Sequence, residues 1–152
     1  MLRFAIIVVM AFVAMEFFSY LVHRFVYHRL LWIFHKSHHT PRKGAFEWND
    51  IFPLVFASSS IYMMSYAVAD PGRSDLLALA IGIAMYGMVY FVIHDMYVHR
   101  RVRNLTFRVP YLQRVKKAHM VHHTYGAEPY GLLLFPLPRD LRNRPVIEDG
   151  AQ

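Results

Sequence analysis

The residues of this chain with the most obvious capacity for chemistry are its ten histidines, which form two sets of five with the same spacing. Each set opens with an H-x4-H pair and closes with an H-x2-HH motif. The first set is His23, His28, His35, His38 and His39, and the second is His94, His99, His119, His122 and His123. Neutral imidazole is a common ligand for iron, zinc, copper and nickel. Because one metal ion takes about four to six ligands, the count predicts two metal ions in one shared site.

Helix geometry gives each motif an expected shape. In an α-helix, positions i, i+3 and i+4 lie on one face, so the three histidines of each H-x2-HH motif are expected to project together. His28 and His35 lie two turns apart and share that face if the helix is unbroken. The members of an H-x4-H pair are separated by about 140° around the helix axis. Such a pair, His23 with His28 or His94 with His99, is therefore expected to splay and to serve different metals or opposite sides of the site.

Several non-catalytic interpretations compete with a catalytic centre. A structural zinc site needs only four ligands and commonly uses cysteine, and the chain contains no cysteine. A bis-histidine haem protein uses one axial histidine on each side of the haem, so paired histidines would be surplus. A divalent-metal transporter places its ligands near the bilayer midplane, whereas these histidines lie at the ends of apolar segments. A catalytic two-metal site is favoured, and a non-catalytic metal-binding membrane protein stays the alternative of another class.

Composition predicts where this site lies. Hydrophobic residues make up 56% of the chain and its mean hydropathy is +0.25, which is high for a soluble domain. Three segments, residues 4–22, 51–69 and 76–93, approach the roughly 20 apolar residues that span a bilayer. The first is longer than the apolar core of a signal peptide and no cleavage motif follows it, so it is interpreted as an uncleaved anchor. We expect an all-α integral membrane protein with three transmembrane helices, forming a single domain over residues 1–152.

The cationic residues predict the orientation of this protein in the membrane. Of the 17 Lys and Arg residues, all but Arg3 and Arg73 lie in segment 23–50 or after residue 93. Three spans put these two segments on one side of the membrane, and the positive-inside rule makes that side cytoplasmic. All ten histidines lie in the same two segments. The site is therefore expected at the cytoplasmic surface.

The connections complete the expected fold. Asp70-Pro71-Gly72 predicts a tight turn between the second and third spans. Pro110 and Gly126 are placed to open and close a helix over residues 110–124, which carries the last H-x2-HH motif and would form a helical cap over the site. Residues 136–152 contain three prolines and mixed charges, and they are expected to form a loosely ordered tail.

Five acidic residues are candidates for orienting the histidines, because a metal-bound imidazole usually donates its second N–H to a carboxylate or a carbonyl. These residues are Glu16, Glu47, Asp50, Asp95 and Glu128. Asp95 adjoins His94 in the sequence. Glu16 lies seven residues before His23, roughly 10 Å into the bilayer at 1.5 Å per residue, where an acidic group is costly and often functional. The alternative for Glu16 is a hydrogen-bonded glutamate that links two spans, through Tyr86 or Tyr90.

The motifs together resemble a known family. From about Met15 to Phe135 the sequence is similar to the bacterial β-carotene hydroxylases, a branch of the membrane fatty-acid hydroxylase superfamily. The similarity is carried by HRFVYH at 23–28, HKSHHTPRKGAFEWND at 35–50, YGMVYFVIHDMYVHRR at 86–101 and AHMVHHTYGAE at 118–128. After Glu128 the family tends to show a glycine-phenylalanine-leucine stretch, whereas this chain has PYGLLLFPLPRD. This departure bears on substrate preference more than on the metal chemistry.

The resemblance implies a specific activity. It implies two non-haem iron ions held among the ten histidines, with O2 as co-substrate and electrons from outside the chain. It also implies hydroxylation at carbon 3 of carotenoid β-ionone rings, which converts β-carotene to β-cryptoxanthin and then to zeaxanthin. The expected location is the inner membrane of a bacterium, with the histidine site on the cytoplasmic side. A fatty-acid or sterol hydroxylase of the same superfamily is the nearer alternative.

The electrons are expected to come from a separate protein of the ferredoxin or ferredoxin-reductase type. No flavin or nucleotide motif is present, since Gly82 and Gly87 lie inside an apolar span and are interpreted as packing positions. Without cysteine the chain has no ligands for an iron–sulfur cluster. The net charge of +7 suits anionic lipid headgroups and an acidic electron donor, with Arg100, Arg101 and Arg103 as the expected docking residues. No nucleic-acid partner is expected.

Overall fold

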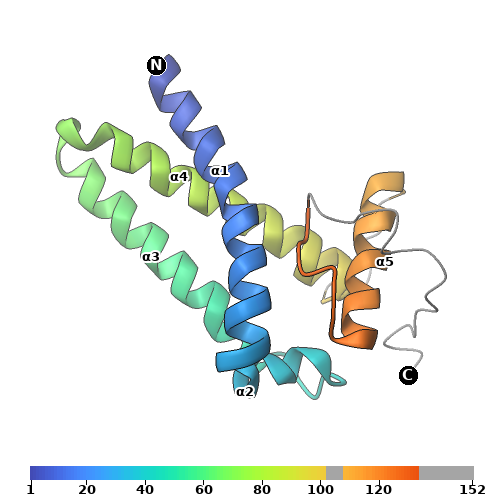
Figure 1. Ribbon diagram of the computed structural model, residues 1–152. Helices are drawn as coiled ribbons and strands as arrows, with labels where there is room; N and C mark the ends of the chain where they lie inside the picture. Colours follow the sequence, from blue (N-terminus) through green and yellow to red (C-terminus); the bar gives the residue numbers. More distant parts are fainter. Residues whose placement is uncertain (102–107, 134–152) are drawn as a thin grey trace.

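The computed structural model describes residues 1–101 and 108–133, and in this part of the chain every regular element is a helix. Three long helical segments dominate the molecule (Figure 1). The first is α1 (Leu2–Val22), which continues into the π-helix η1 (His23–Leu30). The second is α3 (Ile51–Val68), which is preceded by the short 3-10 helix η3 (Trp48–Asp50). The third is α4 (Ser74–Tyr90), which continues into the π-helix η5 (Phe91–Val98).

These three segments are long and apolar enough to cross a membrane, as the hydropathy of the sequence predicted. Their bounds are Leu2–Leu30, Trp48–Val68 and Pro71–Val98, so each begins earlier or ends later than the apolar run alone indicates. Most of their side chains are exposed within the chain, as expected for surfaces that face lipid. The predicted all-α class with three apolar helices is therefore confirmed, while the predicted tail at 136–152 lies outside the described residues.

A tight turn joins the end of the second segment to the start of the third, as predicted. The Asp70 carboxylate accepts a hydrogen bond from the Gly72 N–H at 2.9 Å, and the short 3-10 helix η4 (Pro71–Arg73) leads directly into α4. The resulting hairpin brings α3 against α4, and α1 crosses the other side of α4 (Figure 1).

The crossing of α1 and α4 depends on Gly82. A Cβ atom at this position would lie 2.5 Å from the Val8 carbonyl oxygen and 2.6 Å from the Ala11 Cβ. Glycine therefore allows the two backbones to approach closely, as small residues do in membrane helix pairs. The packing role predicted for Gly82 is confirmed, but a Cβ at Gly87 would meet nothing within 4 Å, so the same prediction for Gly87 was wrong.

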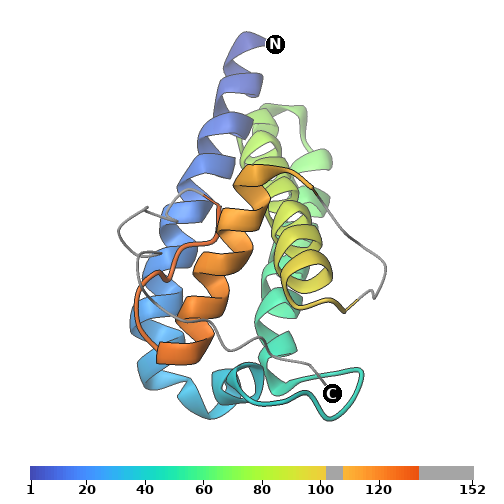
Figure 2. The same cartoon turned by 90° about the vertical axis from the view of Figure 1, so that its right-hand side faces the viewer.

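The opposite ends of the three segments, at Leu30, Trp48 and Val98, are called the inner ends here. They carry short helices and a cap. Beyond η1 the chain turns through α2 (Trp32–His35) and the 3-10 helix η2 (Lys36–His39). The predicted helix over 110–124 is present as α5 (Pro110–Tyr125), with proline in its first turn and Gly126 in the left-handed conformation (φ 63°) at its end. Figure 2 shows α5 lying beside η1 and η5, across the inner ends of the first and third segments.

The π-helices are the main departure from the predicted helix geometry. In η1 the Leu31 N–H donates to the Val26 carbonyl at 2.8 Å, and at the end of η5 the His99 N–H donates to the His94 carbonyl at 3.0 Å. Both are i to i+5 bonds, which are rare and are often found at functional sites. Each π-helix coincides with one H-x4-H pair.

Candidate metal centre

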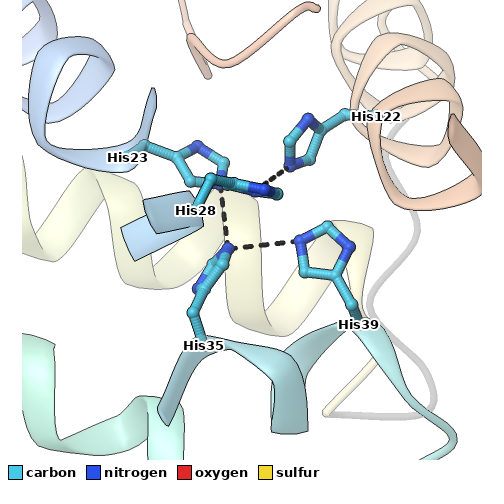
Figure 3. A group of neighbouring side chains, drawn as sticks. All are labelled: His23, His28, His35, His39 and His122. Carbon is cyan, nitrogen blue, oxygen red and sulfur yellow. Dashed lines mark hydrogen bonds between the residues drawn. The ribbon is translucent and has the colours of Figure 1, made fainter. Parts of the chain in front are cut away.

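All ten histidines meet at the inner ends of the helices. Nine of them form two groups whose ring nitrogens can reach a common point, with the nitrogens of a group within 4.8 Å of one another. The five-histidine group contains His23, His28, His35, His39 and His122, and Figure 3 shows these rings converging from η1, α2, η2 and α5. The four-histidine group contains His38, His99, His119 and His123. The tenth, His94, lies next to the second group, with its Nε2 3.1 Å from the Nε2 of His38.

His23 and His28 do not splay between the two groups, so for this H-x4-H pair the predicted assignment to different metals was wrong. His23 and His28 belong to the same group, with ring centroids 5.0 Å apart. His94 and His99 are equally close at 4.6 Å. The prediction assumed α-helical geometry, whereas a π-helix closes its turn with an i to i+5 bond and places residues five apart above one another.

The histidines of each H-x2-HH motif are divided between the two groups, although they were predicted to project together. His35 and His39 join the five-histidine group while His38 joins the other. In α5, His119 and His123 lie in the four-histidine group while His122 lies in the first. Adjacent residues on a helix point roughly 100° apart, so each HH doublet spreads over both groups. The doublets thereby connect the two groups through one backbone.

Backbone and amide oxygens fix the tautomers in the five-histidine group. The Nδ1 of His23 lies 2.8 Å from the Tyr130 carbonyl oxygen, and the Nδ1 of His122 lies 2.7 Å from the Ala127 carbonyl oxygen. For His35 the partner is the Asn49 Oδ1, at 2.7 Å. These oxygens can only accept, so each Nδ1 must carry the ring proton, and the Nε2 of a neutral ring then presents a lone pair.

These lone pairs face one another. The Nε2 atoms of His23 and His35 lie 3.1 Å apart, and Figure 3 shows further close approaches of His28 to His122 and of His35 to His39. A second ring proton would relieve the repulsion, but burial lowers the pKa of His35 to about 3 and that of His122 to about 4. Facing lone pairs on buried neutral rings are stabilised by a cation. The donor set therefore fits a metal ion.

The four-histidine group has the same ring contacts but a different supporting shell. The Nε2 atoms of His99 and His119 lie 3.0 Å apart, and burial holds the pKa of both rings well below 6.5. Here the orienting group is the Glu47 carboxylate, and the Asp95 carboxylate lies near His94 without a hydrogen bond to its Nδ1. Glu47 Oε2 lies 3.2 Å from the Nδ1 of His38, and Asp95 Oδ1 lies 3.4 Å from the Nδ1 of His94.

Arg101 holds these carboxylates together, a role that the sequence did not reveal. Its side chain is 16% exposed and lies 3.6 Å from Glu47 and 3.4 Å from Asp95. It also donates to Asp50, which touches no histidine but accepts from the Glu47 backbone N–H at 3.0 Å. Arg101 thus points inward and not toward a docking partner. The available signal was its position two residues after His99 and six residues after the predicted carboxylate Asp95.

The hydrogen bonds of Glu16 and Glu128 described below join groups other than histidines. Glu16 is 1% exposed and accepts from the Tyr86 hydroxyl at 2.8 Å and from the backbone N–H groups of Leu132 and Leu133. The predicted link from Glu16 to Tyr86 is therefore present. Glu128 accepts from the Tyr20 hydroxyl and the Arg24 guanidinium at 2.8 and 2.6 Å. Asn49 and the carbonyls of Ala127 and Tyr130 were missed, because an amide and two backbone groups carry no distinctive sequence pattern.

The chain is therefore a helical protein of membrane type, with three helices able to cross a membrane and two groups of buried or half-buried imidazoles that could hold metal ions. A family model described as fatty acid hydroxylase matches residues 8–138. Because this match covers most of the sequence, the chain belongs to the fatty acid hydroxylase family, a family of enzymes.

Curated relatives share much of the sequence. A "Beta-carotene hydroxylase" of Pseudescherichia vulneris is 38% identical over 100% of this chain and 92% of the relative. One of Pantoea ananas is 37% identical over 97% of this chain and 88% of the relative. The "Beta-carotene 3-hydroxylase 2, chloroplastic" of Arabidopsis thaliana is 42% identical over 82% of this chain, which spans 43% of that plant relative. No solved structure matched the chain.

Proposed function

We propose that this chain is a non-haem di-iron monooxygenase that hydroxylates carbon 3 of carotenoid β-ionone rings. The observation that carries the metal part of the proposal is the pair of Nε2 lone pairs on His23 and His35, which face each other at 3.1 Å. The substrate part rests on the relatives of comparable length, which are named beta-carotene hydroxylases. The chain would act as a single domain over residues 1–152.

All ten histidines would hold the metals, the five-histidine group around one ion and the four-histidine group with His94 around the other. Bound iron would supply O2 activation, and the net reaction converts a C–H bond, O2, two electrons and two protons to C–OH and water. The protein's own contribution is to fix the rings by their Nδ1 hydrogen bonds. It also buries His94 and His122, which are 2% and 0% exposed, so that bulk water is kept from the site.

An apolar substrate would enter from the bilayer. Both histidine groups lie at the ends of the first and third helical segments, whose exposed side chains include Phe18 and Leu21 in α1 and Phe91 in η5, at 45%, 51% and 45% exposure. A carotenoid ring travelling along this surface would reach the histidines without crossing bulk water. The site would lie at the cytoplasmic face of a bacterial inner membrane, because the cationic residues gather at the same end.

The electrons would come from a separate protein of the ferredoxin type. Arg101 is turned inward onto carboxylates, and Arg103 lies outside the described residues. Arg100 is exposed and is the remaining docking residue of the three expected. Charge reversal at Arg100 should make donor-driven turnover slower, and more so at low salt.

The product test uses bacterial cells that accumulate β-carotene. Expression of this chain should yield β-cryptoxanthin and zeaxanthin, and His39→Ala, which removes one ring of the five-histidine group, should yield neither. Purified protein should contain two irons per chain. Unchanged β-carotene in the presence of iron-loaded protein would reject the carotenoid assignment, and hydroxylated fatty acids or sterols would then identify the alternative. A single redox-inactive zinc per chain would reject the enzyme altogether.

A further inference from the structure

The segment that follows α5 lies directly over the five-histidine group. Residues 126–133, called the strap below, leave α5 at Gly126 and run back alongside α1 (Figures 1 and 2). Pro129, Gly131 and Leu132 of the strap are buried. The strap has no regular secondary structure, so its backbone groups are available to other parts of the molecule.

Two of these backbone groups orient the histidines. The carbonyl of Tyr130 accepts from His23 and that of Ala127 accepts from His122, at 2.8 and 2.7 Å. These two histidines come from different helices, and their rings lie 4.6 Å apart. The Tyr130 ring also packs on this group, with centroids 5.1 Å from His28 and 5.0 Å from His122. The position of the strap therefore sets the direction of two of the five candidate ligands.

Glu16 fixes the end of the strap from inside the apolar segment. One carboxylate oxygen, Oε1, accepts from the backbone N–H groups of Leu132 and Leu133 at 3.0 and 2.7 Å, while Oε2 accepts from the Tyr86 hydroxyl. Loss of this acceptor would leave the buried N–H of Leu132 and the half-buried N–H of Leu133 without this hydrogen bond.

We infer that Glu16 is a positioning residue for the five-histidine group and that it acts through the strap. The inference rests on the proposed metal centre, and it explains why an acidic side chain is kept within an apolar helix. The four-histidine group has a separate support, since the Nδ1 of its His38 bonds the Glu47 carboxylate and not the strap. Substitution of Glu16 should therefore weaken metal binding by the five-histidine group and leave metal binding by the four-histidine group unchanged.

The experiment uses the full chain in detergent, titrated with Co²⁺ alone and followed by visible absorption. Glu16→Met replaces the carboxylate with an apolar side chain of similar length. Glu16→Gln is the conservative control, because its Oε1 can still accept from both backbone N–H groups while its amide donates to the Tyr86 oxygen. Tyr86→Phe is the second control, since it removes the hydroxyl but leaves both backbone contacts.

The expected result is that Glu16→Met weakens one of two Co²⁺ binding phases by about 10- to 100-fold, as loss of orienting groups around metal ligands does. The other phase should match the wild type, which also shows that the variant is folded. Glu16→Gln and Tyr86→Phe should keep both phases. Amide hydrogen exchange at Leu132 and Leu133 should be faster in Glu16→Met alone.

Two results would overturn the inference while leaving the proposed function intact. One is faster exchange at Leu132 and Leu133 with both Co²⁺ phases unchanged, which would show that the strap does not set the site. The other is an equal weakening of both phases, which would show a general loss of structure. A wild-type chain that binds no Co²⁺ would instead reject the metal centre itself, and this inference with it.

Discussion

The carboxylate of Glu47 accepts from the Nδ1 of His38 at 3.2 Å, and the same carboxylate lies 3.6 Å from the Arg101 guanidinium. Burial raises the pKa of Glu47, and Arg101 opposes this shift by stabilising the ionised form. A histidine of the four-histidine group is thus oriented by a carboxylate that depends on an arginine nearby. By contrast, the five-histidine group is oriented by neutral carbonyl and amide oxygens.

Arg101→Gln should therefore weaken metal binding by the four-histidine group, by about 10- to 100-fold. The reason is that Glu47 and Asp95 lose the positive charge that keeps them ionised and in place. The measurement is a metal-binding titration of the purified chain. Arg100→Gln is the matched control, since Arg100 is the exposed neighbour of Arg101 and should bind metal as the wild type does. Equal effects of the two substitutions would contradict the inward role of Arg101.

Asn49 offers a comparable test of the five-histidine group. Its Oδ1 is the acceptor for His35 at 2.7 Å, so Asn49→Leu should remove the group that fixes the proton on Nδ1 and should weaken metal binding by about 10- to 100-fold. Asn49→Asp retains an acceptor oxygen and should restore most of the affinity. If the leucine variant binds metal normally, then the tautomer of His35 is not set by Asn49.

Acidification should destabilise the metal-free protein. Burial lowers the pKa of His39 to about 2 and that of His122 to about 4, from the ordinary value of 6.5. Above pH 6.5 these rings are neutral in the folded and unfolded chains, and the full stability is present. Below it the unfolded chain binds protons that the folded chain does not, so the free energy of unfolding falls with pH until the folded pKa values are reached.

Urea unfolding in detergent at about pH 7.5 and about pH 5 measures this effect. The midpoint should be lower at the acid pH, and the difference should shrink in His39→Gln, which removes one of the rings. A midpoint that rises on acidification would mean that the rings are protonated in the folded chain. Bound metal should add to the loss at low pH, because its ligands must be deprotonated.

Gly82 and Gly87 form a matched pair for testing the crossing of α1 and α4. Gly82→Ala should cost about 1–3 kcal/mol through overpacking, because its Cβ would lie 2.5 Å from the Val8 carbonyl oxygen. Gly87→Ala places a methyl group in open space and should change stability little or increase it slightly. Thermal unfolding in detergent distinguishes the two, and equal stability of both variants would show that the helices separate at little cost.

Hydropathy and spacing alone predicted the parts of this molecule that depend on side-chain type. The three apolar helices, the turn at Asp70, the helix opened by Pro110 and the gathering of ten histidines all follow from such patterns. The division of the histidines did not follow, for two reasons. The H-x4-H prediction used the 3.6-residue turn where the chain adopts π-helix, and the H-x2-HH prediction placed adjacent histidines on one face although they reach different groups. The strap carbonyls could not be found either, since every residue has one.

Arg101 shows a different limit of sequence reasoning. A cluster of arginines beside a membrane helix is ordinarily interpreted as a surface for lipids or partners. Which of them turns inward depends on where Glu47, Asp50 and Asp95 meet in three dimensions, and Asp95 is more than 40 positions away from the other two in the sequence. Pairing of distant charges is a property of the tertiary fold.

The π-helix at His23–Leu30 gives the five-residue spacing of its histidines a further meaning. Within about one turn, an α-helix aligns two rings at a spacing of three or four, so an H-x4-H pair whose rings converge has one residue more than one α-helical turn can accommodate. Deletion of a single residue such as Val26 would let the segment return to α-helix with its two histidines still aligned. An H-x4-H spacing therefore indicates π-helix, and an H-x3-H spacing α-helix, wherever both histidines of such a pair reach one site.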